Sequence, residues 1–154
     1  MKKLLLVVLL TPLFAAGPGP AVLIVWKSDD LKSYEKKLAP KMNEHKSANE
    51  ELAKYASYRI EIVHREGDAE AETHVNNSEV FFIVSGEATE IVGGTPVGNK
   101  TVSPGEIHGS ALNGGSRTEL RAGDVLRMPA NVTHRMLVAT GKQITFMVVK
   151  EPVN

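Results

Sequence analysis

The residues best suited to chemistry are two glutamates and two histidines in two short segments. Glu72 and His74 are two positions apart, so both point to one face if they lie on a strand. Four residues then separate His74 from Glu79, and a hairpin there would bring Glu79 opposite His74. His134 comes from a distant segment. Two imidazoles with one or two carboxylates suit Fe(II), Mn(II), Ni(II) or Zn(II), so we predict one divalent metal bound by Glu72, His74, Glu79 and His134.

The role of Glu72 is the most open of the four. It is a metal ligand, a catalytic general base, or the partner of Arg65 or Arg127 in a salt bridge. The arginines Arg127 and Arg135 flank the second segment, where each either binds a carboxylate substrate or is solvated at the surface.

Two other histidines have alternative interpretations. His64 shares a strand face with Ile60 and Ile62, so it either points into the barrel near the metal or is a hydrogen-bonded core histidine, which we favour. His108 lies in a glycine-rich stretch, and we favour an exposed loop position over one at the mouth of the site.

Composition narrows the classes of function. The chain has 154 residues, enough for one domain, and its 18 basic residues balance 18 acidic ones. The chain therefore lacks the excess of positive charge that favours nucleic-acid binding. The chain has no cysteine, which excludes a disulfide scaffold, a cysteine nucleophile and a thiolate metal site.

The first twenty residues have the pattern of a secretory signal peptide. Two lysines follow Met1, an apolar run covers residues 4–10, and small residues are frequent over 15–21. The apolar run is too short to cross a bilayer, so we expect export to the periplasm or medium without a stable membrane anchor. The sequence does not decide the position at which the signal peptide is cleaved.

The remaining chain changes from helical to strand periodicity. Residues 28–56 have apolar residues at helical spacing, interrupted by Pro40, so we predict a helical extension over 21–55. From Tyr58 onward apolar and polar residues alternate between turn signals, which predicts an all-β barrel domain over 56–154. Residues 80–84 are apolar on both strand faces, so the helices or a second subunit must cover the outer face, and we expect a homodimer.

Residues 93–117 differ from the other connections because they hold 7 of the 13 glycines and few large apolar residues. A loop of this length in a small domain is typical of a functional flap or a disordered insert. We predict a flap over the barrel mouth, anchored by Val97, Ile107 and Leu112, that brings His108 or Glu106 nearest the site.

The two segments resemble the two conserved motifs of the cupin superfamily, over about residues 56 to 150. That family's first motif is a glycine, His-x-His, a glutamate and a second glycine, and its second is a glycine, Pro-x-Gly and a histidine. Glu72 replaces the first motif's first histidine, and Asn131 replaces the glycine of Pro-x-Gly. The positions that match in type are Gly67, His74, Glu79, Gly86, Gly123, Pro129 and His134.

The resemblance implies a cupin jelly-roll β-barrel and, from the Glu-x-His pattern, a small exported single-domain bacterial cupin. Cupins include dioxygenases, isomerases, lyases, sugar-binding domains and metal-free storage proteins, so the fold alone does not select a reaction. We expect a metal-dependent enzyme of oxygenase, isomerase or lyase type acting on a small oxygenated molecule. The alternative is a non-catalytic periplasmic module that binds a small ligand or a metal.

Overall fold

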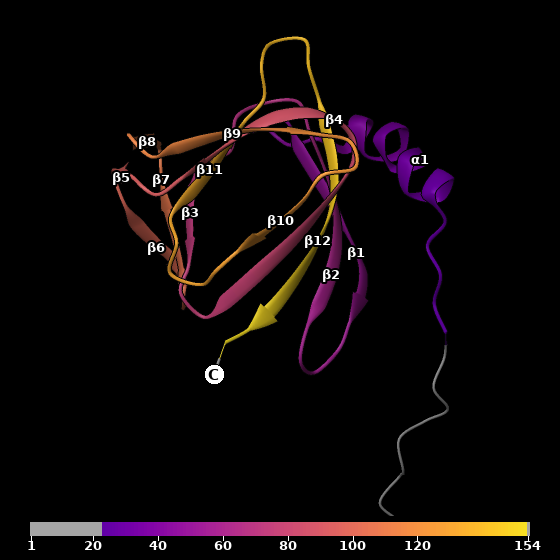
Figure 1. Cartoon of the computed structure of the whole chain (residues 1–154), viewed down its shortest axis with the longest axis horizontal. Helices are drawn as coiled ribbons and strands as arrows, with labels where there is room; N and C mark the ends of the chain where they lie inside the picture. The colour runs from indigo at the N-terminus through magenta and orange to yellow at the C-terminus, as the bar shows by residue number, and fades with distance from the viewer. Residues whose placement is uncertain (1–22, 154) are drawn as a thin grey trace, which may run out of the picture.

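The computed structural model describes residues 23–153, so the predicted signal peptide lies outside the described residues. It contains one helix, α1 (Ser28–Leu38), a short 3-10 turn (Ala39–Lys41) and twelve strands. Figure 1 shows how the helix lies beside the curled strands. Acidic residues in the first turn of α1 and lysines in its last turn complement the helix dipole. In the part of the chain that the structure describes, no helix is long and apolar enough to cross a membrane.

The prediction of helix up to residue 55 was wrong over β1 (Ser47–Lys54), which is a strand paired with β2 (Arg59–Arg65). Ala48 and Leu52 are four residues apart, a spacing that places two side chains on one face of either a helix or a strand. The helical stretch instead ends at the turn that contains Pro40, and Lys46 has a positive φ of 50° just before the strand. Glu50, on the same face of β1, contacts Lys37 of α1 at 2.7 Å.

Ten of the twelve strands in the described part of the chain form one strongly curled antiparallel sheet, and the other two, β5 (Thr95–Val97) and β8 (Ala111–Asn113), pair with each other, which confirms the predicted all-β fold. At its centre is β4 (Asn77–Val92), whose first half pairs with β10 (Val125–Met128) and whose second half pairs with β9 (Ser116–Arg121). A register shift between β4 and β12 (Ile144–Pro152), which leaves Val84 of β4 without a partner on β12, marks the change between the halves just before Gly86. Gly86 has a φ of 78°, and a Cβ there would lie 2.0 Å from the Gln143 carbonyl oxygen, so only glycine fits.

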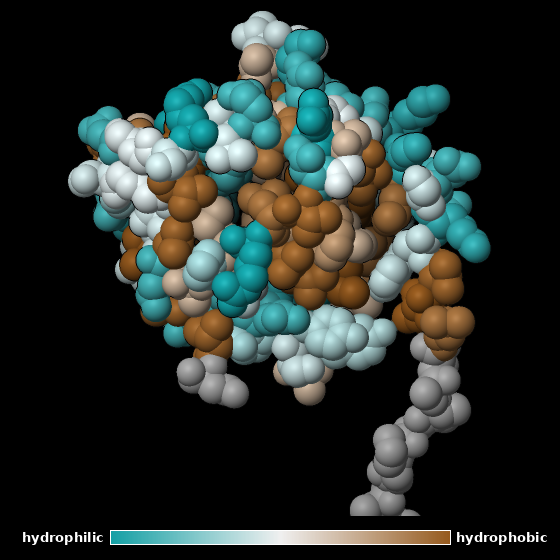
Figure 2. Space-filling model, in the orientation of Figure 1, coloured by the Kyte–Doolittle hydropathy of each residue, from teal (hydrophilic) through white to brown (hydrophobic). Residues whose placement is uncertain are grey.

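Both faces of the sheet carry apolar residues. The interior core is built around Phe81, Ile83 and Phe146, whereas Ile62 and Val84 on the outer face pack beneath α1. The helix therefore covers part of the outer face, as predicted. Phe82 and Val125 are left exposed outside the part covered by α1, and Figure 2 shows apolar side chains gathered over β4, β10 and β12.

The 93–117 segment is built mainly of strands, so the prediction of a loop was wrong, whereas the prediction that it brings Glu106 next to the predicted site is confirmed. It contains β5 (Thr95–Val97), β6 (Lys100–Ser103), β7 (Glu106–Gly109) and β8 (Ala111–Asn113). Gly105, with a φ of 82°, makes the turn between β6 and β7. Through β7 the segment adds to the edge of β3 (Ala71–His74) and extends the barrel wall. Of the three predicted anchors, Leu112 is buried in a small core and Val97 is exposed.

Candidate metal centre

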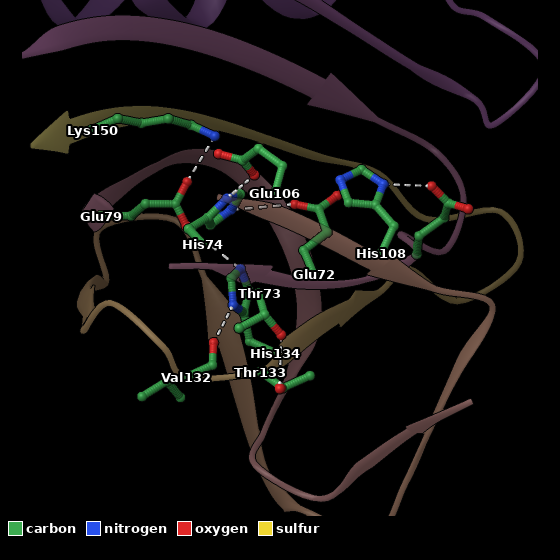
Figure 3. A network of polar contacts seen from close by, with 11 residues as sticks. Glu72, Thr73, His74, Glu79, Glu106, His108, Val132, Thr133, His134 and Lys150 are labelled. Carbon is green, nitrogen blue, oxygen red and sulfur yellow. Dashed lines mark hydrogen bonds and ion pairs between the residues drawn. The ribbon is translucent and has the colours of Figure 1, made fainter. Parts of the chain in front are cut away.

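The four predicted ligands lie together inside the barrel, on three strands. Glu72 and His74 are on β3, Glu79 is near the start of β4, and His134 opens β11 (His134–Leu137). His134 is the register partner of Glu72, which joins the two distant segments directly. Figure 3 shows the side chains converging.

Backbone contacts fix the loop that presents His134, and among them the amide of Gly93 donates to the carbonyl oxygen of Thr133 at 2.8 Å. The amide of Asn131 donates to the carbonyl oxygen of His74 at 2.9 Å, and Asn131 has a left-handed φ of 62°. Asparagine tolerates this conformation better than most side chains, so the loop keeps its turn without a glycine.

Nitrogen and oxygen atoms of the four side chains lie within a few ångströms of one another. One ligand atom from each of Glu72, His74 and His134 lies within 4.8 Å of the others. The Oε2 atom of Glu79 is 3.3 Å from Nε2 of His74 and 3.5 Å from Nε2 of His134. Oε2 of Glu72 is 3.6 Å from Nε2 of His74.

Hydrogen bonds on the outer ring nitrogens turn both Nε2 atoms toward this cluster. Nδ1 of His134 donates to the carbonyl oxygen of Val132 at 3.1 Å. Nδ1 of His74 donates to Oε2 of Glu106 on β7, so the glycine-rich segment supplies a residue next to the site. A carboxylate or carbonyl on the outer nitrogen is the usual arrangement for a histidine that binds a metal.

Two buried atoms of the cluster lack a hydrogen-bond partner among the described residues. They are Nε2 of His74 and Oε2 of Glu79. Buried polar atoms are nearly always paired, so these two point to a missing partner. A divalent cation contacts such nitrogen and oxygen atoms directly, and the donor set therefore fits a metal of the Fe, Mn, Ni or Zn class.

The electrostatics of the cluster keep its carboxylates ionised. Burial opposes ionisation of Glu79, but the nearby His74 and Lys150 outweigh it and lower the pKa of Glu79 to about 2. Burial would also raise the pKa of Glu72, but His74 and His134 lower it overall. Burial lowers the pKa of His134, which favours the neutral imidazole that a metal requires.

Without a metal, His74 holds a proton among the carboxylates. Burial lowers its pKa, but the Glu72 and Glu79 carboxylates outweigh burial and raise the pKa to about 10. Metal binding at Nε2 would therefore release a proton.

A cavity of about 200 Å³ lies beside the cluster within the barrel. Glu72, Glu79 and His134 form part of its wall, so a small molecule in the cavity would reach the predicted metal position. The remaining wall combines apolar residues, among them Phe81 and Phe146, with charged ones.

Comparison with known proteins gives structural matches only. No family model matches the chain, and a search of curated proteins finds no match. Among solved structures, a cupin-like protein from Thermotoga maritima aligns with 14% identity and a TM-score of 0.50, over 68% of each chain. The chain has the cupin fold.

Other solved structures share this cupin fold. A protein from Bacillus halodurans aligns with 13% identity and a TM-score of 0.60, over 88% of this chain and 85% of its own. The DMSP lyase DddQ from Ruegeria pomeroyi aligns with 17% identity and a TM-score of 0.50, over 69% of this chain. The chain spans 47% of the length of that lyase, and the same share of a second DMSP lyase structure.

The structure decides between the alternatives for His64 and His108. His64 is fully buried on the outer face of the sheet, where Nδ1 contacts Thr145 Oγ1 at 2.9 Å, so it is the hydrogen-bonded core histidine. His108 is half-buried on β7, with Nδ1 2.8 Å from Oε2 of Glu70, and is neither a loop residue nor freely exposed.

The two arginines that flank the second segment lie in different places. Arg127 is exposed, whereas Arg135 lines the cavity and donates from Nε to the carbonyl oxygen of Ala69 at 2.9 Å. Within residues 23–153, Glu72 forms no ion pair with Arg65 or Arg127 within 4.0 Å, so the salt-bridge alternative for Glu72 was wrong.

Several charged residues of the cavity, among them Lys150 and Glu90, were not identified from the sequence. Lys150 lies 2.9 Å from Oε1 of Glu79, and Glu90 is buried in the cavity wall. The alternation of apolar and polar residues places both on the inner face of the barrel. Lys150 follows the inward-pointing Phe146 and Val148 at every second position, and Glu90 follows Ala88 in the same way.

Proposed function

We propose that this protein is a cupin-type enzyme that uses one divalent metal to act on a small oxygenated organic molecule. The observation that carries this proposal is the convergence, beside a cavity, of two imidazoles and two carboxylates, among which the buried Nε2 of His74 and Oε2 of Glu79 have no hydrogen-bond partner among the described residues. Glu72, His74, Glu79 and His134 would hold the metal. Glu72, Glu79 and His134 line the cavity, so a small molecule could reach a metal held there, which supports catalysis over storage.

The metal would supply Lewis-acid or oxygen-activating chemistry when bound. The chain's own charged residues set the protonation states of the groups around the metal position. Glu72 lies in the cavity wall, and its lowered pKa keeps the carboxylate ionised, which is the form that binds a metal. If Glu72 is not a ligand, its place in the wall puts the carboxylate within reach of a proton on a bound molecule. Lys150 engages one oxygen of Glu79 and leaves the other facing the histidines.

The reaction class within this proposal is that of an oxygenase, isomerase or lyase. We also propose export after signal-peptide cleavage and assembly as a homodimer, supported by the N-terminal sequence and by the exposed apolar residues over β4 and β10. The second candidate, a non-catalytic module that binds a ligand or a metal, is supported by the same ligand set.

Reconstitution separates the two candidates. Chelated protein is loaded with Fe(II), Mn(II), Ni(II) or Zn(II) in turn and incubated with small hydroxy and keto acids under air, and the mixture is followed by NMR. Formation of a new compound with at least one metal, and not with chelated protein, supports an enzyme. Saturable binding with every compound recovered unchanged identifies a binding module, and failure to bind any of the metals overturns the metal proposal.

A further inference from the structure

Glu90 stands apart from the metal cluster and has no assigned partner. Its side chain is 1% exposed, it lies on β4, and it forms part of the cavity wall. Neither carboxyl oxygen has a hydrogen-bond partner among the described residues. A buried carboxyl group without a partner is unfavourable for folding, so its retention points to a ligand that pairs with it.

The surroundings of Glu90 favour its neutral form. Burial and the negative charges of Glu72 and Glu79 raise its pKa to about 8, although Arg65 opposes them. In either protonation state the carboxyl group offers an oxygen that accepts a hydrogen bond, which matches the donor of an alcohol hydroxyl group.

Arg65, on β2, lines the same cavity, where burial lowers the pKa of its guanidinium group and the charges of Glu72, Asp68 and Glu90 oppose this without forming an ion pair with it. In the described part of the chain, no acidic side chain lies within 4.0 Å of its nitrogens. Arg65 differs in this respect from Lys150, which is occupied by Glu79. A guanidinium group matches a carboxylate in shape and charge, so an organic acid is its natural partner.

We propose that Arg65 and Glu90 form the recognition end of the cavity for a small hydroxy acid, with the ligand carboxylate on Arg65 and its hydroxyl group on Glu90. This proposal rests on the proposed function, because it specifies the substrate class of the same cavity. The volume of about 200 Å³ suits a ligand of a few carbon atoms.

Paired probes test the two contacts by calorimetry on the purified full-length protein. L-Lactate is compared with propionate, and 3-hydroxybutyrate with butyrate, because each pair differs only by the hydroxyl group. L-Alanine tests an ammonium group at the same position. We expect the hydroxylated acid of each pair to bind about tenfold more tightly, as one hydrogen bond allows.

Substitutions of Glu90 and Arg65 test which residue produces the preference for the hydroxylated acid. Glu90→Leu removes an unfavourable buried group, so it should fold, retain its metal and bind both members of a pair equally. Arg65→Gln should weaken binding of all four acids, and Glu87→Gln, at an exposed position on the same strand, should bind like the parent. Metal content is measured for each variant.

Several results would overturn the proposal. They are a hydroxyl preference that persists in Glu90→Leu, tighter binding of L-alanine than of L-lactate, and no saturable binding of any acid. Metal content distinguishes this failure from failure of the proposed function. Protein that contains metal but shows no hydroxyl preference contradicts only the recognition end, whereas protein that lacks metal but shows a preference dependent on Glu90 contradicts only the metal proposal.

Discussion

Glu106 accepts a hydrogen bond from Nδ1 of His74, although the two residues are 32 positions apart in the chain. The contact exists because β7, within the glycine-rich 93–117 segment, pairs with β3. The segment is therefore part of the wall that holds His74, and it supplies the carboxylate that directs Nε2 of this histidine toward Glu79.

Glu106→Gln tests this positioning role. The amide can still contact His74 but lacks the negative charge, so metal affinity should fall about 10- to 100-fold, as for other groups that orient a metal-bound histidine. The measurement is competition with a chromogenic chelator. Glu119→Gln, an exposed change on β9, serves as the control, and equal affinity in both variants would show that Glu106 has no role in metal binding.

Glu72→His tests whether Glu72 is a ligand. Histidine at this position would restore the His-x-His pattern of the first cupin motif, so the variant should retain one metal per chain with an altered ligand field. Cobalt substitution and visible absorption report the change. An absorption spectrum identical to that of the parent would exclude Glu72 from the metal's ligands.

The raised pKa of Glu90 should make the stability of the folded chain depend on pH. Its pKa is raised to about 8 in the folded chain against 4.5 for an ordinary glutamate, so the folded state retains a proton that the unfolded state loses. The stability from this proton is complete below about pH 4.5 and is lost as the pH rises through 8. Melting temperatures of chelated parent and Glu90→Gln should therefore diverge over this range, with the parent falling relative to the variant, and a constant difference would contradict the raised pKa.

The exposed apolar residues over β4 and β10 should lie in the dimer interface. Val125 is 61% exposed and Phe82 37% exposed, and the two are register partners. Val125→Glu places a charge there and should shift the dimer toward monomer in light scattering after gel filtration. Thr101→Glu, at an exposed position on β6, should leave the mass unchanged, whereas a parent protein that is already monomeric would contradict the homodimer.

The sequence predicted the features that depend on local spacing. The two-residue period identified the barrel strands, and the motif spacing brought Glu72, His74, Glu79 and His134 together. Helix and strand could not be distinguished over residues 47–54, because the spacing of Ala48 and Leu52 satisfies both periods.

The features that depend on long-range pairing could not be predicted. The strands of the 93–117 segment are short and polar, so nothing local to them indicates that β7 adds to β3. Lys150 and Glu90 occupy inward positions where apolar residues are expected, and only the folded barrel shows that they face a charged cavity.

The most direct test of the central claim is the metal content of the protein purified from its native compartment, measured by elemental mass spectrometry beside His134→Ala. Two imidazoles and two carboxylates converge at one position, so the parent should contain about one equivalent of a single divalent transition metal. His134→Ala should lose most of it and melt at a lower temperature, because metal binding stabilises the folded state. Equal metal content in parent and variant, or none in the parent, would contradict the metal centre.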